Sequence, residues 1–166
     1  MEPLAKIILA QDKKTVISAI LPDYINEEKG VLTADDALKG AMDIIAEDVS
    51  DNTAVRTALK RLYNRTGIVE SKGDEEKESV YTQYYDFQQP VNKIASHRVL
   101  ALNRGEKEGF LKVNIAVDRQ AAISEIEKIY IKGKNESADI VKNAISDSYT
   151  RLIHPSLDTE IRNNLT

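Results

Sequence analysis

The sequence contains no cysteine, only two histidines, and no apolar run of membrane-spanning length. Without cysteine there can be no disulfide framework, no zinc finger or ribbon and no thiol nucleophile, and a cytosolic setting fits best. The run Ala5–Ala10, interrupted by Lys6, is far shorter than the roughly 20 residues that cross a bilayer, and no signal segment opens the chain. We therefore expect a soluble, cytoplasmic protein.

Groups that could carry catalysis are also scarce. His97 follows a serine at an expected helix start and His154 precedes a proline, and neither has a second histidine or a carboxylate at metal-ligand spacing. The acidic pair Asp35-Asp36 falls at a helix start, where the helix dipole explains it. We predict no catalytic residue, no metal site and no cofactor, so the chain is not expected to be an enzyme.

Positive charge is confined to two short stretches of an otherwise acidic chain. The net charge is −4, yet residues 50–72 and residues 91–112 each hold five basic and two acidic residues. Residues 1–49 hold five basic and ten acidic residues, and residues 73–90 hold one and five. Because polyanion binding depends on local cation density, the two basic stretches fit either a phosphate-binding surface or ordinary surface patchiness.

The first half of the chain has the periodicity of helices. A helix is predicted over Ala34–Val49, where apolar residues recur every three or four positions. Thr33 stands three residues before Asp36, a spacing that satisfies the free amides of a helix start. Another stripe, from Val16 to Leu21, stops at Pro22, which has no amide proton.

A second helix follows the short segment Ser50–Thr53 and runs to Gly67. Its outer side carries four cations at four-residue spacings, namely Arg56, Lys60, Arg61 and Arg65. Two helices joined by a tight turn, the second of them basic, suggest a helix-turn-helix with Ile68–Ser71 as a strand of a wing. A plain helical hairpin with a solvated basic face is the competing interpretation.

The middle of the chain is irregular. Residues 72–79 are too charged for a core and are predicted to form an exposed loop. Four aromatic residues then lie within a short acidic stretch, namely Tyr81, Tyr84, Tyr85 and Phe87. Such rings could stack on unpaired bases, but the acidic setting favours a helix that buries them.

The strongest strand pattern is Leu111 to Val117, where apolar and other residues alternate after a helix predicted from Ser96 to near Gly105. Its nearest candidate partner, Ile68–Ser71, is weak. A two-stranded ribbon is marginal alone, so we expect the partner to lie in sequence outside this chain or in a second copy of it.

The last third is again helical. The stripe that starts at Val141 is expected to be capped by Ser137, and Pro155 is expected to kink or restart the helix before its apolar stripe continues to Leu165. The sequence thus predicts a mainly α fold with two regions. Region 1–72 contains the helix-turn-helix-like hairpin, and region 73–166 contains one strand and a long C-terminal helix.

An ordered series of motifs resembles the bacterial Tex family of transcription accessory proteins. The most specific motif is Ser96–Gly109 (SHRVLALNRGEKEG), and the others include Ala37–Ala41 (ALKGA), Tyr84-Tyr85-Asp86 and Glu160–Asn163 (EIRN). Two departures are Ala95, where the family would have proline, and His154, where a small residue is more usual.

The resemblance implies a multidomain cytoplasmic protein. A helical region with a helix-turn-helix would precede an RNase-H-like domain, helix-hairpin-helix elements and an oligonucleotide-binding barrel. This chain would be the stretch before the RNase-H-like domain, without the family's extreme N-terminus and without the domains after Thr166.

We therefore expect a non-catalytic scaffold and nucleic-acid-associated module. The expected phosphate contacts are Arg56, Lys60, Arg61, Arg65, Arg98, Arg104 and Lys107, and such contacts would be salt-sensitive and sequence-blind. The alternative is a protein-interaction scaffold whose basic stretches meet RNA polymerase or a neighbouring domain.

Overall fold

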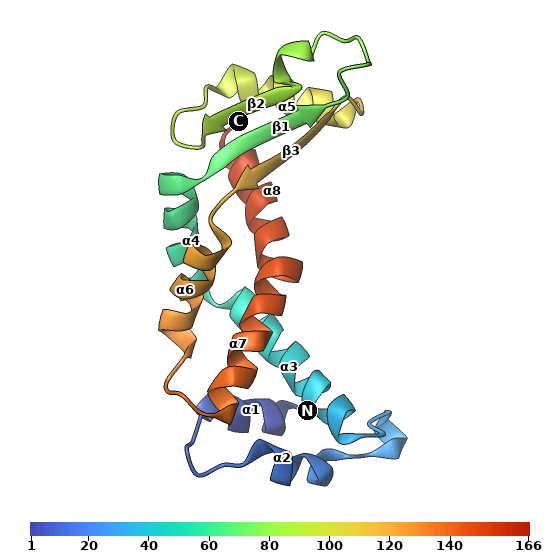
Figure 1. Cartoon of the computed structure of the whole chain (residues 1–166), viewed down its shortest axis with the longest axis vertical. Helices are drawn as coiled ribbons and strands as arrows, with labels where there is room; N and C mark the ends of the chain where they lie inside the picture. The colour runs from blue at the N-terminus through green and yellow to red at the C-terminus, as the bar shows by residue number, and fades with distance from the viewer. The chain divides into compact units, whose positions relative to one another are not determined.

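The computed structural model describes all residues from Met1 to Thr166. Most of them are helical and three short strands form one sheet, which confirms the predicted mainly α fold with a minor β element (Figure 1). The elements are α1 (Glu2–Ala10), α2 (Ile17–Ile20), η1 (Leu21–Tyr24), η2 (Glu27–Lys29), α3 (Ala34–Asp51), α4 (Thr53–Thr66), β1 (Ile68–Gly73), η3 (Thr82–Tyr84), β2 (Asp86–Pro90), α5 (Ser96–Lys107), β3 (Leu111–Ala116), α6 (Arg119–Tyr130), α7 (Glu136–Ser148), η4 (Tyr149–Ile153) and α8 (His154–Asn164).

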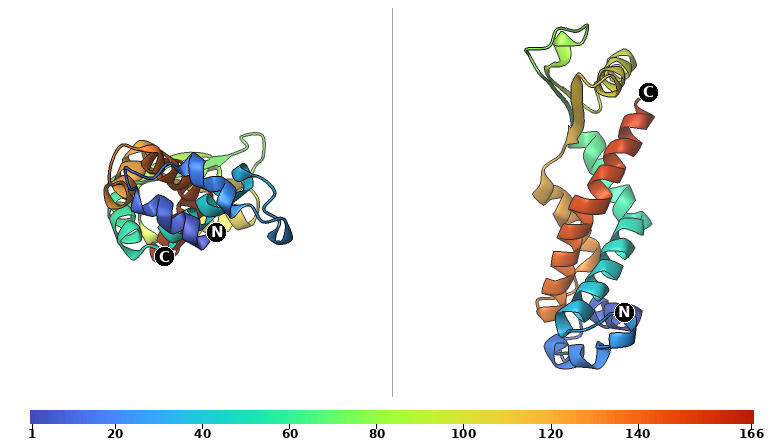
Figure 2. Two further views of the ribbon diagram at one scale, coloured as in Figure 1. Left: turned by 90° about the horizontal axis from the view of Figure 1, so that it is seen from below. Right: turned by 90° about the vertical axis from the view of Figure 1, so that its right-hand side faces the viewer.

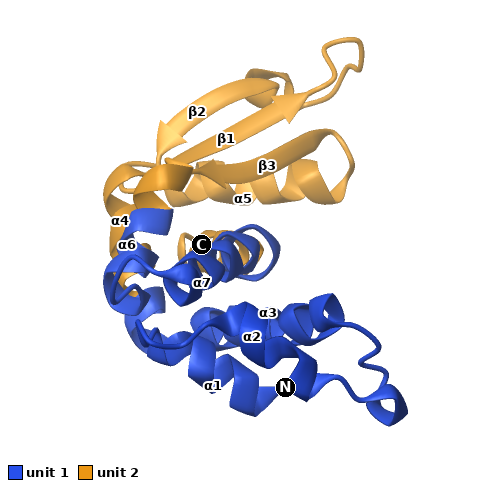
Figure 3. Ribbon diagram, turned by 60° about the horizontal axis from the view of Figure 1, so that its bottom comes forward, with its two compact units in different colours: residues 1–56, 123–153 blue, residues 57–122, 154–166 orange.

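The chain forms two compact units, and each unit is built from two segments. Unit 1 comprises residues 1–56 and 123–153, and unit 2 comprises residues 57–122 and 154–166 (Figure 3). The units divide the chain differently from the predicted regions 1–72 and 73–166, whose boundary falls within β1. Helices α7 and α8 follow each other without a break through the π-helical segment η4, and the change from π- to α-helix falls one residue before Pro155.

Unit 1 is built around α3. The Thr33 hydroxyl accepts a hydrogen bond from the Asp36 amide at 3.1 Å, and the Asp36 carboxylate accepts one from the Leu32 amide at 3.2 Å. The predicted helix start is therefore confirmed. One face of α3 is buried, at Ala37, Ala41, Ile45, Ala46, Val49 and Ser50. This face packs along α7, and α1 contacts both helices.

The predicted cap of α7 is wrong. Asn135 is the N-cap, because its side-chain oxygen accepts a hydrogen bond from the Ala138 amide at 2.8 Å. The amide group of Asn135 also donates to the Gln11 carbonyl at 2.8 Å, which fixes the side chain at the start of the helix. The helix thus begins before Ser137, and the Ser137 hydroxyl is buried without a hydrogen-bond partner.

Unit 2 contains an antiparallel sheet with strand order β2-β1-β3. The central strand β1 pairs with both neighbours, so that Val69 lies opposite Gln89 on one side and opposite Ile115 on the other. The expectation that the partner of Leu111–Val117 lies outside the chain is therefore wrong. The β1 signal is weak in the sequence because only one of its two buried positions, Val69, is apolar, and the other is Ser71.

Helix α5 covers one face of the sheet (Figure 2). Every second side chain is buried on that face, namely Val69, Ser71, Leu111, Val113 and Ile115. The helix runs to Lys107, beyond its predicted end at Gly105. Gly105 is needed for packing, since a Cβ atom there would lie 2.5 Å from a methyl group of Leu111.

The aromatic segment does not form the predicted helix. It forms the short 3-10 turn η3, followed by the strand β2. In this strand Phe87 pairs across the sheet with Ser71. Burial of the rings is confirmed for Tyr81, Tyr84 and Tyr85. The predicted exposed loop is present as well, although it begins after Gly73 because β1 extends to that residue.

Candidate nucleic-acid interface

The predicted turn between the first two long helices is a single residue. Asn52 joins α3 to α4 and accepts a hydrogen bond from the Val55 amide at 3.1 Å, which confirms it as one of the predicted caps. Arg56 lies one turn further on and donates to the Ser50 carbonyl at 2.7 Å and to the Ser50 hydroxyl at 3.2 Å. Its guanidinium therefore holds the end of α3. The helix-turn-helix interpretation stays a prediction.

The other three predicted cations of α4 belong to unit 2. Lys60 forms an ion pair with Glu160 of α8, with 2.6 Å between the ammonium nitrogen and a carboxylate oxygen. Arg61 and Arg65 are exposed and have no ion pair. They lie four residues apart on one side of α4, so they are available to an anionic ligand.

The cations of α5 fall into two kinds. The Arg98 guanidinium lies 5.6 Å from the centre of the Phe87 ring, a cation–π contact with the neighbouring strand β2. Arg104 and Lys107 are exposed, three residues apart, and neither forms an ion pair. Of the predicted phosphate contacts, four remain exposed and unpaired: Arg61, Arg65, Arg104 and Lys107.

A polar cluster that the sequence did not indicate lies between α8 and the outer edge of β3. Arg162 donates to Glu106 at 2.7 Å, to Asn103 at 3.0 Å and to the Val113 carbonyl at 3.3 Å. Asp158 accepts a hydrogen bond from the Ile115 amide at 2.8 Å. The two α8 side chains thus satisfy backbone groups that an edge strand would otherwise leave unpaired.

The electrostatics of this cluster favour the charged state of Arg162. Burial alone would lower the pKa of Arg162, but its hydrogen bond to Glu106 and the charges of Glu106 and Asp158 raise that pKa above its ordinary value. No local spacing in the sequence relates Glu106 to Arg162, because 56 residues separate them. Only the folded topology brings them together.

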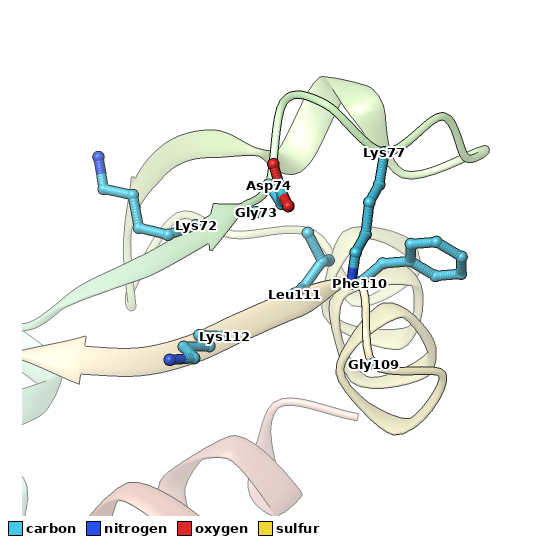
Figure 4. A pocket seen from close by; sticks show the side chains of 8 residues that line it. All are labelled: Lys72, Gly73, Asp74, Lys77, Gly109, Phe110, Leu111 and Lys112. Carbon is cyan, nitrogen blue, oxygen red and sulfur yellow. The ribbon is translucent and has the colours of Figure 1, made fainter.

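A second unpredicted feature is a depression at the end of the sheet, with a volume of about 370 Å³ (Figure 4). We call it the lysine pocket. It lies between the loop after β1 and the turn before β3, and its lining is Lys72, Gly73, Asp74, Lys77, Gly109, Phe110, Leu111 and Lys112. Its cations lie in strands and a loop rather than on a helix face, so helical periodicity could not reveal them.

The two histidines lie apart from these cations. His154 is half-buried, and its Nδ1 atom lies 2.6 Å from the hydroxyl of the buried Tyr63. His97 is exposed in the first turn of α5. No helix of the protein is both long enough and apolar enough to span a membrane.

Comparison with known proteins identifies the family of this chain. The model of the "Tex central region-like" family matches residues 12–166. YdcI of Bacillus subtilis is 39% identical over 171 residues, which cover all of this chain and 24% of YdcI. Protein tex of Bordetella pertussis is 35% identical over 121 residues, covering 71% of this chain and 15% of that protein.

Transcriptional accessory protein Tex of Neisseria gonorrhoeae is 34% identical over 125 residues, covering 72% of this chain and 16% of that protein. The chain therefore belongs to the Tex family, as its motifs predicted. It spans less than a quarter of the length of each of these relatives.

Proposed function

We propose that this chain is a non-catalytic scaffold and nucleic-acid-associated module of a cytoplasmic, Tex-like transcription accessory protein. Family membership supports the link to transcription, since relatives carry the name transcriptional accessory protein. The observation that carries the nucleic-acid part is the exposed, unpaired pair Arg61 and Arg65 on α4. Contacts from such cations to phosphate are salt-sensitive and independent of base sequence.

The non-catalytic part of the proposal rests on what the titratable groups do. His154 is engaged with Tyr63, and the clustered acids Glu106 and Asp158 bind Arg162 and the β3 edge. These contacts hold helices and strands together. General acid–base catalysis would need such groups to converge on a site that a substrate can enter.

A second candidate function is favoured by a groove in unit 1. The groove has a volume of about 520 Å³ and is lined by Asp35, Leu38, Lys39, Met42, Asp43, Asp147 and Arg151. Asp147 pairs with Arg151 at 2.9 Å, whereas Asp35 and Asp43 form no ion pair. These two aspartates beside the apolar Leu38 and Met42 would suit a basic segment of a protein partner. In that case the chain would be a protein-interaction scaffold that contacts polymerase or a neighbouring domain.

A binding titration separates the two functions. The 166-residue chain would be titrated with labelled single-stranded and duplex oligonucleotides at low and moderate salt. If Arg61 and Arg65 contact phosphates, Arg61→Ala with Arg65→Ala should weaken binding and reduce the slope of log affinity against log salt by about 1 to 2. Such a loss would support the nucleic-acid function.

The matched control removes two exposed lysines of unit 1, Lys13→Ala with Lys14→Ala. It changes the net charge by the same amount but at a different place. If binding depends on the local contacts of Arg61 and Arg65, the control should leave the affinity within about twofold. Absence of binding at low salt, or an equal loss in the control, would remove the nucleic-acid function from this chain and leave the protein-interaction scaffold.

A further inference from the structure

The lysine pocket contains two like charges placed directly across from each other. Lys72 of β1 and Lys112 of β3 are cross-strand partners, and both side chains are exposed on the face of the sheet opposite α5. Like charges at such positions destabilise a strand pair. An anion bound beside both ammonium groups would turn this repulsion into attraction.

Neighbouring side chains neutralise only part of this charge. Lys72 forms an ion pair with Asp86 of β2, with 2.6 Å between the charged atoms. Lys112 and Lys77 are exposed and have no ion pair. Figure 4 shows Lys77 extending from the loop after β1 toward Phe110. The pocket therefore offers two uncompensated cations and a third that is shared.

The wall of the pocket also presents an aromatic ring. Phe110 is half-buried, and its ring centre lies 5.9 Å from that of the buried Tyr81. The Phe110 amide donates to the Gly105 carbonyl at 2.9 Å, and Gly109, with φ of 84°, makes the turn before it. The ring is thus held from one side while it lines the pocket with the other.

Acidic residues limit what can enter. Asp74 lines the pocket, and Glu75 and Glu76 follow it in the exposed loop. A duplex brings closely spaced phosphates from two strands and would be repelled by this loop. A flexible single strand can place its phosphates near the individual lysines and bend away from the acidic loop. The volume of about 370 Å³ is that of a small-ligand pocket.

We propose that the lysine pocket binds one nucleotide of a single-stranded nucleic acid. Its base stacks on Phe110, beside which the Lys77 ammonium group lies, and Lys72 and Lys112, whose side chains point away from Phe110, contact neighbouring phosphates of the same strand (Figure 4). This inference rests on the proposed nucleic-acid function and assigns a part of the binding to a site distinct from Arg61 and Arg65. Aromatic stacking with nearby cations is the recurring mode of sequence-tolerant single-strand binding.

The test uses a fluorescent 12-nucleotide strand, oligo(dT) or oligo(U), and anisotropy titrations of the 166-residue chain. Lys112→Ala removes an exposed cation without an ion pair and should weaken binding about fivefold at low salt. Phe110→Leu removes the aromatic ring but keeps an apolar side chain, and should weaken binding about tenfold. Phe110→Tyr keeps a ring and should bind within about twofold of the parent chain.

An abasic strand of the same length distinguishes stacking from a change in folding. It retains the phosphates, so Lys112→Ala should still weaken its binding, whereas Phe110→Leu should not. Equal sensitivity of both strands to Phe110→Leu would show that the ring acts only through the fold and would overturn the stacking assignment. Thermal unfolding of each variant checks that the sheet is intact.

The outcomes separate this proposal from the broader one. Binding that depends on Arg61 and Arg65 but is unchanged by Lys112→Ala and Phe110→Leu would overturn the pocket and keep the nucleic-acid function. No strand binding at low salt would overturn both. A poly-glutamate peptide that binds in place of the strand, with the same sensitivity to both variants, would assign the pocket to a protein partner and contradict the proposal.

Discussion

The side-chain interactions that connect helices and strands differ chemically between unit 1 and unit 2. In unit 1 the connections are mostly neutral. The Gln11 side chain donates to the Tyr130 carbonyl at 2.6 Å and accepts from the Lys132 amide at 2.7 Å. The Ser148 hydroxyl donates to the Ala46 carbonyl at 2.6 Å. Uncharged side chains thus complete the hydrogen bonding of buried backbone groups.

In unit 2 ionised side chains complete the hydrogen bonding of backbone groups. Arg162 and Asp158 bind the Val113 carbonyl and the Ile115 amide, and Lys60 pairs with Glu160. The difference follows from the elements joined, since a sheet edge exposes backbone groups at the protein surface, where charged side chains remain hydrated. We infer that salt and pH act on the two units differently, while their apolar cores respond alike.

The largest expected effect concerns the apolar cores. Ile45 of unit 1 and Ile115 of unit 2 are both fully buried. Replacing either by alanine should lower the free energy of unfolding by about 2 to 5 kcal/mol, because the removed methyl groups leave a cavity. Urea denaturation measures the loss, and the matched variants Ile45→Val and Ile115→Val should cost only about 0.5 to 1.5 kcal/mol. A loss in one unit alone would contradict the equivalence of the cores.

The second prediction concerns the charged edge of unit 2. Arg162→Met keeps an unbranched side chain but leaves Asp158, Glu106 and the Val113 carbonyl without their donor. We expect a loss of about 1 to 3 kcal/mol in the free energy of unfolding, and a smaller loss in 1 M salt, where the parent contacts are screened. Amide exchange at Ile115 should also accelerate, since its acceptor Asp158 is no longer held.

The matched variant in unit 1 is Gln11→Met. It leaves the Tyr130 carbonyl and the Lys132 amide unsatisfied and should cost a similar amount. Its loss should not change with salt, because no ionised group takes part in these two bonds. If Gln11→Met and Arg162→Met show the same salt dependence, the chemical distinction between the units does not hold.

The sequence was sufficient where structure depends on neighbours along the chain. Helix periodicity and the Thr33 cap predicted α3, and alternation predicted β3. The sequence was not sufficient where two residues could each cap the same helix and a contact distant in the sequence decided between them. Asn135 is the cap in place of Ser137, and the backbone carbonyl of Gln11, which follows α1 and lies more than a hundred residues away in the sequence, holds its side chain.

The candidate site shows the same limit. Helical spacing found the exposed pair Arg61 and Arg65 on α4. It could not show that Arg56 and Lys60 are engaged by Ser50 and Glu160, because those contacts depend on how the chain turns. The lysine pocket was missed because its cations come from two strands and a loop, and because Ile68–Ser71 was only a weak candidate partner for Leu111–Val117.

The third prediction uses a hydrogen bond of unit 1 in which both side chains can ionise. Tyr130 donates to the Asp48 carboxylate at 2.8 Å. Burial and this hydrogen bond to Asp48 raise the pKa of Tyr130 well above its ordinary value. The neutral phenol is therefore favoured in the folded state. Its stabilising contribution is fully present below the ordinary tyrosine pKa of about 10 and is lost as the pH rises beyond it.

Tyr130→Phe should accordingly cost about 1 kcal/mol at pH 7, where it removes the hydrogen bond. Above pH 10 the parent chain should lose stability more steeply than Tyr130→Phe, so that the two curves converge. Denaturant titrations at pH 7, 9 and 10.5 measure this. Parallel curves would mean that the Tyr130 hydroxyl titrates normally and does not link pH to the stability of unit 1.

The smallest effect has the opposite sign and tests whether unit 1 is fully satisfied. The Ser137 hydroxyl is buried in α7 and has no hydrogen-bond partner. A buried, unpaired hydroxyl costs free energy, and alanine is also the better helix former. Ser137→Ala should therefore raise the free energy of unfolding by about 0.5 kcal/mol, whereas Ser148→Ala, which removes the bond to Ala46, should lower it by about 1 kcal/mol. If both serine variants destabilise the chain alike, Ser137 has a partner in solution and the neutral network of unit 1 extends to the start of α7.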